Sequence, residues 1–292
     1  MCMVDGWQPR GAMVEYWFFR TSWHGGALLV DFIRRRDQEH AEIRVASWHG
    51  GNGRVDRTEA PRDQVPSGAD GDCVLDEQRS RGAVGAAAWD LDFTRSTSRV
   101  AAPPPPLHRT RPFDLSLVSW PDLTCTGAVT VHGVAIALDG APGMACHYWG
   151  RRLPDRWVWL SAHEFDRPGV AIEVSLLNSR LWGVPVPLPP LGYAWLREPG
   201  RERYVASPLT GLVRRTAGAH GLQITVTAPR SSWTLTARAD ARSFLDLGDG
   251  IVQSLRGDCQ VRTPSGAIAT ARGTAVLELR TKRWSTTGVP TA

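Results

Sequence analysis

Residues 145–165 read "ACHYWGRRLPDRWVWLSAHEF". The stretch holds three tryptophans and two histidines, and a Pro-Asp pair, which is a turn signal, divides it into two runs. Trp157 and Trp159 lie two residues apart, so on a strand they share one face while Val158 points to the other. The stretch predicts two strands joined by a turn, with aromatic surface that suits either a core or a binding pocket.

The same period of two continues through the chain. "AEIRVASW" (41–48) alternates apolar and charged side chains, and "VAIEVSL" (170–176) sets Glu173 and Ser175 against apolar neighbours. Turn residues separate such runs at intervals of about 8 to 15 residues, which is typical of all-β proteins. We expect no helix beyond a short turn near "TGLVRR" (210–215). The pattern therefore predicts an antiparallel barrel or sandwich.

Two segments interrupt this rhythm. Residues 52–82 are polar and rich in proline and glycine, which predicts a long exposed loop. Residues 101–112 contain four consecutive prolines, which form a stiff extended segment that cannot enter a central strand. "GAVTVHGVAIALDG" (127–140) ends in Asp-Gly, a hairpin signal.

The composition is that of a globular protein of 292 residues, enough for one large or two ordinary domains. No apolar run approaches the roughly 20 residues of a membrane span, and the N-terminal residues do not form a signal peptide. The five cysteines are scattered without a C-x-x-C pair, which indicates reduced thiols. We therefore expect a cytoplasmic protein.

The net charge is +5, and the positive charges come almost wholly from arginine, because Lys282 is the single lysine. The arginines are spread along the chain, and acidic residues lie near most of them. We therefore expect no nucleic-acid partner. A single lysine also argues against Schiff-base and P-loop chemistry.

Two patterns raise the question of a metal site. "SWHGG" occurs at 22–26 and again at 47–51, so His24 and His49 could form a pair of ligands. No third ligand has suitable local spacing, and the acidic run "ADGDCVLDE" (69–77) lacks the full calcium-loop pattern. We expect no metal and no cofactor.

A longer stretch, "TGAVTVHGVAIALDGAPGMACHYWGRRLPDRWVWLSAHEF" (126–165), resembles the central signature of the tocopherol cyclase family. There a strand pair leads into a Y-x-E-K-N-W-G block followed by P-x-x-W-x-W. The matching residues are Pro142, Trp149, Gly150, Pro154, Trp157, Trp159 and Phe165. The block is also similar to that of the carotenoid 1,2-hydratases, and "VEYWFFR" (14–20) resembles the opening motif of these and related lipocalin-like proteins.

The resemblance implies two lipocalin-like antiparallel β-barrel or half-barrel domains packed side by side, which we place at residues 1–145 and 146–292. It also implies a hydrophobic small-molecule substrate. We expect a cofactor-free cyclase or isomerase acting on a prenyl- or polyene-bearing substrate, by cation-type or pericyclic ring formation. The alternatives are a hydratase of an isoprenoid or carotenoid double bond and a non-catalytic lipid carrier. Fold alone does not choose among them. We expect no transmembrane segment, allow a loose contact with membranes, and leave the oligomeric state open.

An enzyme that protonates an alkene needs an acid, a dry pocket, and aromatic faces that stabilise a carbocation. Trp149, Trp157 and Trp159 suit the last role. The complete set of expected substrate-binding residues is Trp17, Trp149, Trp157, Trp159, Tyr148 and Glu15. The alternative is that the tryptophans belong to the core.

His147 and Glu173 are the expected catalytic residues. His147 matches the histidine of the hydratase block, and histidine can act as an acid near neutral pH. Relatives carry an acid just before that position, where this chain has Cys146, so the proton must come from elsewhere. Glu173 is the replacement that we favour, since burial among tryptophans would raise its pKa. Glu15 and Asp31 are weaker candidates for the acid, and Asp31, if buried, needs a partner such as a nearby arginine.

Overall fold

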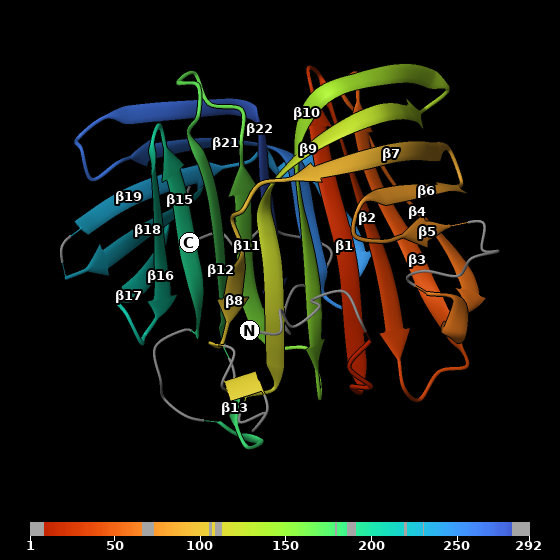
Figure 1. The fold of residues 1–292 in the computed structure, drawn as a ribbon, viewed down its shortest axis with the longest axis horizontal. Helices are drawn as coiled ribbons and strands as arrows, with labels where there is room; N and C mark the ends of the chain where they lie inside the picture. The colour runs from red at the N-terminus through yellow and green to blue at the C-terminus, as the bar shows by residue number, and fades with distance from the viewer. Residues whose placement is uncertain are drawn as a thin grey trace. The chain divides into compact units, whose positions relative to one another are not determined.

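A computed structural model describes residues 9–65, 73–104, 107–108, 113–178, 180–185, 191–218, 221–229 and 231–281. Their regular structure is almost entirely β-strand (Figure 1), which confirms the all-β prediction. Contacts divide the chain into two compact units, Met1–Ala101 with Asp114–Leu153 and Ala102–Phe113 with Pro154–Ala292. The predicted boundary, between residues 145 and 146, falls inside a strand.

The first sheet has ten strands in the order β4-β3-β2-β1-β10-β9-β7-β6-β5, and β8 also pairs with β9. Every strand pair for which a register is given is antiparallel. A short 3-10 turn, η1 (Arg62–Gln64), follows β4. The strands are β1 (Val14–Trp23), β2 (Gly26–Arg35), β3 (His40–His49), β4 (Asn52–Pro61), β5 (Val74–Leu75), β6 (Arg79–Val84), β7 (Ala87–Arg95), β8 (Val100–Ala102), β9 (Leu115–Val131) and β10 (Val134–Gly150).

The second sheet also has ten strands, in the order β16-β15-β12-β11-β22-β21-β19-β18-β17, with β20 paired to β21. The small strands β13 (Arg180–Leu181) and β14 (Val184–Pro185) form a separate pair, and η2 (Ala241–Ser243) precedes β20. The strands of the large sheet are β11 (Arg156–Ala162), β12 (Ala171–Asn178), β15 (Leu191–Glu198), β16 (Arg201–Ser207), β17 (Leu212–Gly218), β18 (Gly221–Ala228), β19 (Ser231–Arg238), β20 (Phe244–Gly248), β21 (Ile251–Arg262) and β22 (Ile268–Thr281).

The two sheets share one connectivity. In each, four strands form a meander that starts beside the final strand of the unit, so β1 pairs with β10 and β11 pairs with β22. The final hairpin of each unit is formed by β9 with β10 or by β21 with β22. The next three strands, β5–β7 or β17–β19, continue the sheet from the other side of that hairpin. The eighth strand of each unit, β8 or β20, pairs with the ninth, β9 or β21. This duplication confirms the predicted two β halves of one architecture.

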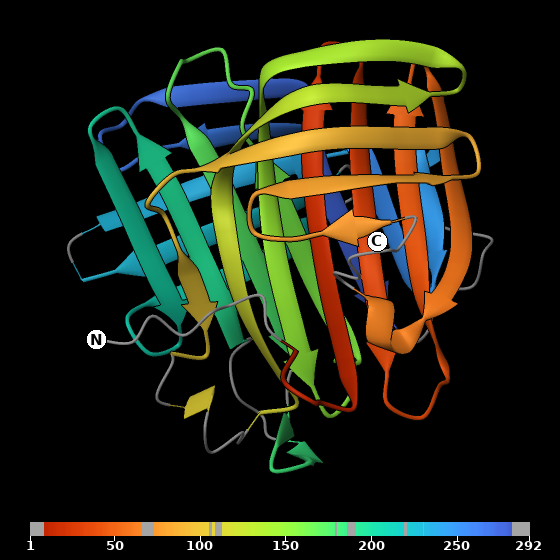
Figure 2. The same ribbon diagram turned by 45° about the vertical axis from the view of Figure 1, so that its right-hand side comes forward.

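The hairpin between β9 and β10 turns at a different place from the one predicted. His132 and Gly133 both have positive φ, as a two-residue hairpin turn requires. Asp139-Gly140, which we expected to be the turn, lies inside β10 at a register shift, where Gly140 has φ +75. The Asp-Gly signal therefore marks a β-bulge. Figure 2 shows the two long strands side by side.

Two further predictions were wrong. Residues 52–82 do not form one loop, because β4 occupies Asn52–Pro61 and β6 begins at Arg79. Most side chains of β4 are exposed at one end of the strand order, so a polar sequence is compatible with a strand there. The turn expected near residues 210–215 is largely the start of β17. Half of the proline-rich segment, residues 105–106 and 109–112, lies outside the described residues.

Each unit has its own apolar core on one face of its sheet. In the first unit Trp17, Phe19 and Trp149 belong to that core. In the second unit Val158 and Leu160 belong to it. Because side chains alternate along a strand, Trp17 lies on the core face of its sheet, whereas Trp159 lies on the face opposite its core.

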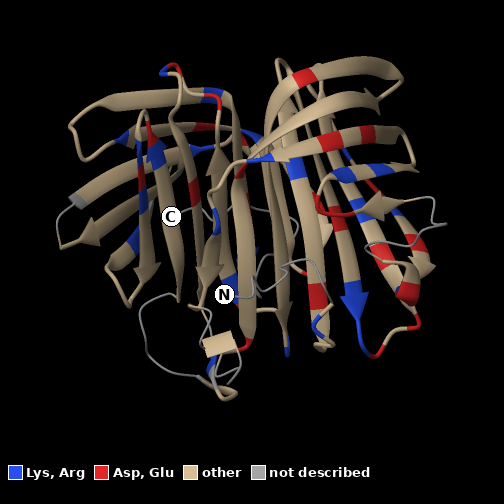
Figure 3. Ribbon diagram, viewed as in Figure 1, with Lys and Arg blue, Asp and Glu red and all other residues tan. Residues whose placement is uncertain are grey.

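Charged residues of both signs are distributed over the strands (Figure 3). On β2, β3 and β4 they pair across the sheet, as Glu42 does with Arg35 and Arg57. Within the described part of the chain the cysteines are buried and free of disulfides. No helix there is long and apolar enough to span a membrane.

Candidate functional site

Pairing of β1 with β10 brings four predicted residues of the first unit together. Glu15 lies opposite Trp149, and Trp17 lies opposite His147. Residues opposite each other on paired strands have side chains on the same face, and so do residues two apart on one strand. The four side chains therefore form a block on the core face.

His147 is fully buried at the centre of this block. Its ring stacks on Trp17 with centroids 4.5 Å apart and planes inclined by 11°, and the Trp149 ring lies 4.8 Å away. Nε2 of His147 lies 3.4 Å from Oε2 of Glu15, an ion-pair distance that exceeds a good hydrogen bond. The imidazole and the carboxylate form one buried ionisable pair.

The Glu15 carboxylate is held by backbone donors as well as by His147. The N–H groups of Arg10 and Ala12 donate to it, each at a shortest distance of 2.9 Å. Burial alone would raise the pKa of Glu15, but His147 and these two N–H groups together lower it below its ordinary value. Glu15 is therefore ionised at neutral pH and supplies the negative charge of the block.

The tryptophans of this block are packed rather than open. Trp17 is completely buried and Trp149 nearly so, and both are members of the apolar core. The guanidinium of Arg10 lies 5.3 Å from the Trp149 ring centroid, and that of Arg34 lies 5.8 Å from Trp17. Cations of the protein itself thus already lie near these rings. This arrangement favours the alternative interpretation, in which the two tryptophans are core residues.

Tyr148 and Cys146 do not take part in this block. Both alternate with His147 along β10, so they lie on the opposite face of the sheet. The Tyr148 ring stacks on Phe18, with centroids 5.7 Å apart. The structure therefore separates Tyr148 from the other predicted substrate-binding residues of the first unit.

Asp31 lies on that opposite face and has the arginine partner that its burial required. Nε of Arg44 donates to Oδ2 of Asp31 at 2.7 Å, and Nη2 lies 2.6 Å from the same oxygen. Both side chains are buried. Burial raises the pKa of Asp31 even though Arg44 opposes this effect. The expectation of a buried, paired carboxylate is confirmed.

Glu173 is the centre of a second cluster, which lies in the second unit. Its neighbours in register are Ser161 on β11 and Trp195 on β15. The side chain is completely buried. Nε1 of Trp159 donates to Oε1 of Glu173 at 3.1 Å, and the Tyr193 hydroxyl donates to the same oxygen at 2.5 Å. An indole, a phenol and a carboxyl thus meet on one face of the sheet, opposite the apolar core.

The same face continues across β11, β22 and β21. Nε1 of Trp157 donates to Oε1 of Glu278 at 2.6 Å, and Nε2 of Gln253 donates to Oε2 at 2.8 Å. The guanidinium of Arg280 lies 5.1 Å from the Trp157 ring centroid. Trp157 and Trp159 therefore share a face, as predicted, and each donates to a carboxyl group.

Two buried polar atoms on this face have no hydrogen-bond partner among the described residues. They are Oγ of Ser161 and Oε1 of Gln253, and both residues are completely buried. Buried polar atoms are almost always paired, so an orphan atom needs an explanation such as a ligand or an ordered water. The second cluster therefore offers hydrogen-bonding capacity that its own side chains do not use.

The sequence offered Glu173, Trp157 and Trp159 as candidates, but not Tyr193, which contacts Glu173, or Gln253, which contacts Glu278. The available signal was strand alternation. "LGYAWLRE" (191–198) places Tyr193 and Trp195 in phase, and "IVQSL" (251–255) interrupts an apolar strand with Gln253. Which residues on separate strands would meet depended on a register that the sequence did not reveal.

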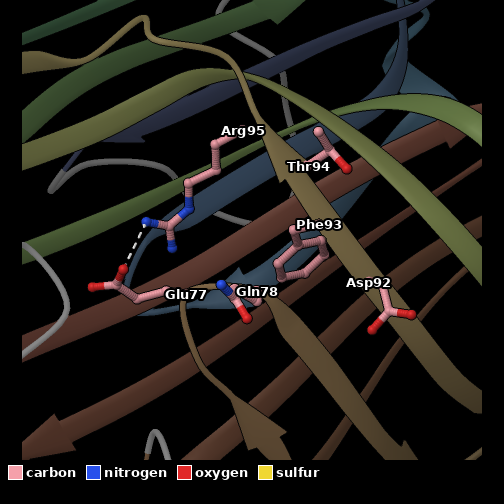
Figure 4. A pocket seen from close by; sticks show the side chains of 6 residues that line it. All are labelled: Glu77, Gln78, Asp92, Phe93, Thr94 and Arg95. Atoms are coloured by element: carbon pink, nitrogen blue, oxygen red, sulfur yellow. Dashed lines mark ion pairs between the residues drawn. The ribbon is translucent and has the colours of Figure 1, made fainter.

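A surface pocket lies away from both clusters, in the first unit (Figure 4). It has a volume of about 480 Å³ and is lined by Glu77, Gln78, Asp92, Phe93, Thr94 and Arg95. Most of these side chains are exposed, and Arg95 faces Glu77 at 3.5 Å. The pocket contains none of the predicted residues and lacks a buried acid, so we do not assign the chemistry to it.

The described residues do not include a group of three histidine, cysteine or acidic side chains placed to hold a metal ion. The His49 ring lies 6.4 Å from the ring of Trp23. The glutamates of the two clusters are engaged by indole, phenol, imidazole, amide and backbone donors. The arrangement suits proton transfer by a carboxyl group.

The sequence matches no protein-family profile and no curated protein. Several solved structures share the fold, including the following two. An AttH protein from Nitrosomonas europaea is 17% identical with a TM-score of 0.60, covering 96% of each chain. Kievitone hydratase from Nectria haematococca is 13% identical with a TM-score of 0.64, covering 97% of this chain and 94% of the other. The likeness spans both units and shows that this chain has the two-unit fold of these proteins.

Proposed function

We propose that this chain is a hydratase that adds water to a carbon–carbon double bond of a lipophilic, isoprenoid-type substrate, with Glu173 as the proton donor. The observation that carries the proposal is the fully buried Glu173 carboxyl with Trp159 and Tyr193 on one oxygen. A carboxyl group in a dry aromatic setting has the features that alkene protonation requires.

The proposal departs from the cyclase or isomerase that we expected from the sequence. The fold is shared with a protein named as a hydratase, whereas neither named structure is a cyclase. Identity of 13% does not transfer that activity, so the argument for hydration rests on the site. Among the described residues, no contact favours ring closure over capture of the cation by water.

The reaction can be written with all atoms balanced. The Glu173 carboxyl gives its proton to one alkene carbon, and the other alkene carbon becomes a tertiary cation. The oxygen of a water molecule bonds to that cation and then loses a proton to the Glu173 carboxylate, which restores the acid. Aromatic rings stabilise such a cation by about 0.5–2 kcal/mol each without attacking it.

Ser161 is suited to hold the attacking water. Its Oγ is buried, lacks a partner among the described residues, and belongs to the residue opposite Glu173 in register. Residues opposite each other in antiparallel strands have Cβ atoms about 5 Å apart. A water bound to Ser161 would thus lie near the carboxyl that first donates and later accepts a proton.

The test uses farnesol, an isoprenoid alcohol with three double bonds, in deuterated water. Hydration would place one carbon-bound deuterium beside a new tertiary alcohol, which mass spectrometry detects. We expect Glu173→Gln to lower the rate by about 10²–10⁴-fold while binding persists, because it keeps the shape and removes the acid. Glu202→Gln is the matched control, since Glu202 is exposed and also accepts from a tryptophan, Trp195.

Binding of farnesol without any product would favour the lipid-carrier alternative and overturn the hydratase proposal. A cyclic product without incorporated water oxygen would restore the cyclase expectation. Unchanged turnover in Glu173→Gln would remove Glu173 as the acid.

A further inference from the structure

Gln253 is completely buried in the middle of β21. In register it lies opposite Glu278 on β22, which in turn lies opposite Trp159 on β11. The row Gln253, Glu278, Trp159 therefore crosses three adjacent strands on one face of the sheet. Ser175 on β12 lies opposite Trp159, and Glu173, two residues before Ser175, lies on the same face.

The orientation of the Gln253 amide is fixed by its neighbour. Nε2 lies 2.8 Å from Oε2 of Glu278, and a carboxylate only accepts hydrogen bonds. Turning the amide over would place its oxygen against the carboxylate, which is repulsive. The other oxygen of Glu278 accepts from Trp157, so the carboxylate itself is held in place.

The fixed amide leaves Oε1 of Gln253 as a buried acceptor with no donor among the described residues. Burying an acceptor without a donor is unfavourable, and native structures contain few such atoms. A donor from outside the chain would satisfy it. Because Oε1 only accepts, that donor must carry a hydroxyl or an N–H group.

We propose that Gln253 is a specificity residue whose Oε1 accepts a hydrogen bond from a hydroxyl or N–H group of the substrate, remote from the double bond that reacts. The inference rests on the proposed function and narrows its substrate class. The substrate is then an amphipathic isoprenoid with a polar end, rather than a pure hydrocarbon polyene.

The spacing of the sheet sets the scale of such a substrate. Three strand steps separate β21 from β12, at about 4.8 Å each, and the two residues along the strand add about 3.3 Å each. Gln253 and Glu173 are therefore on the order of 15 Å apart along the sheet. A long isoprenoid chain, with its hydroxyl at one end and its last double bond at the other, is suited to that separation.

The experiment compares farnesol with its methyl ether, which has the same chain but no hydroxyl donor. Tryptophan fluorescence measures the Kd of each, and deuterium incorporation measures turnover. The wild-type protein should bind the alcohol about 10–100-fold more tightly, because the ether leaves Oε1 buried without a donor. Gln253→Met should reduce that preference to less than about threefold. Gln260→Met on the same strand is the control, because Gln260 is exposed and should keep the preference.

The comparison of the two ligands on the wild-type protein uses no variant, so it stands even where Gln253→Met fails to fold. Equal Kd values with turnover of both compounds would overturn this inference and leave the hydratase proposal intact. A preference that persists in folded Gln253→Met would also overturn it, because the discrimination would then arise elsewhere. No saturable binding of either compound would overturn both proposals.

Discussion

The two units share a strand order but place their polar clusters on opposite faces. In the first unit His147 and Glu15 lie on the core face, between the core tryptophans Trp17 and Trp149. In the second unit Glu173 lies on the face away from its core, held by Trp159 and Tyr193. Composition alone would not separate the clusters, since each combines a glutamate with aromatic rings.

The difference lies in the atoms that each carboxyl group contacts. In the first unit the Glu15 carboxylate accepts from two backbone N–H groups and lies 3.4 Å from the His147 imidazole. In the second unit Glu173 accepts from Trp159 and Tyr193, and Ser161 and Gln253 on the same face retain buried atoms with no partner among the described residues. Guanidinium groups lie near tryptophan rings in both units, so they do not distinguish the clusters. A buried polar atom without a partner needs an explanation such as a ligand or an ordered water. We therefore propose a structural role for the first cluster and substrate binding at the second.

The largest expected effect is the loss of a core tryptophan from the first unit. Trp17→Ala should destabilise the protein by about 3–5 kcal/mol, because it removes a completely buried ring from the apolar core. Thermal unfolding should show a Tm lower by about 10 °C. Trp159→Phe, which keeps a ring but removes the donor to Glu173, should instead act mainly on turnover. A Tm of Trp17→Ala equal to that of the wild-type protein would contradict the structural role of the first cluster.

The next effect concerns the buried pair of the first unit. Glu15→Gln should cost about 2 kcal/mol at neutral pH, because it removes the negative charge that accepts from two backbone N–H groups and pairs with His147. The pKa of Glu15 is lowered by folding, so its contribution is complete above its ordinary value near 4.5. That contribution is lost as the pH falls through the lowered folded-state value.

Urea unfolding at a series of pH values measures this effect. The wild-type and Glu15→Gln stabilities should differ at neutral pH and converge in acid. Parallel curves throughout would show that the carboxylate is not the group that matters. A loss of turnover in folded Glu15→Gln equal to that of Glu173→Gln would assign catalysis to the first cluster instead.

A smaller effect is expected at the hydroxyl that donates to Glu173. Tyr193→Phe keeps the ring and removes one of the two donors that hold Oε1 of Glu173. The carboxyl group would then be less firmly oriented toward the substrate. The rate should fall by about fivefold, the equivalent of about 1 kcal/mol. Turnover equal to that of the wild-type protein would show that this hydrogen bond does not position the acid.

Much of this molecule could be predicted from strand alternation. "RWVWLSA" and "VAIEVSL" gave the correct faces for Trp159 and Glu173, because a period of two is a local property. The contacts of Glu173 with Tyr193 were not predictable, because they depend on pairing between strands distant in sequence. Asp139-Gly140 failed as a hairpin signal since the same φ > 0 suits a bulge. Which face of each sheet carries its core is likewise a tertiary property.

The smallest effect on stability, and the sharpest test of the comparison, is expected at Ser161. Its Oγ is buried without a partner among the described residues, so Ser161→Ala removes an unsatisfied group and should change stability by less than about 0.5 kcal/mol, or stabilise slightly. Turnover should nevertheless fall by about tenfold, since the water loses its hydrogen bond beside Glu173. Ser175→Ala is the control for removing a serine hydroxyl from this face, because Ser175 lies on the neighbouring strand β12.

A variant that is as stable as the wild type yet slower marks a group retained for function. Urea unfolding and deuterium incorporation from the same preparations measure both quantities. If Ser161→Ala destabilises the protein by 1 kcal/mol or more, on the order of an ordinary buried hydrogen bond, then the hydroxyl has a structural role. The second cluster would then resemble the first, and the assignment of substrate binding to its face would lose its basis.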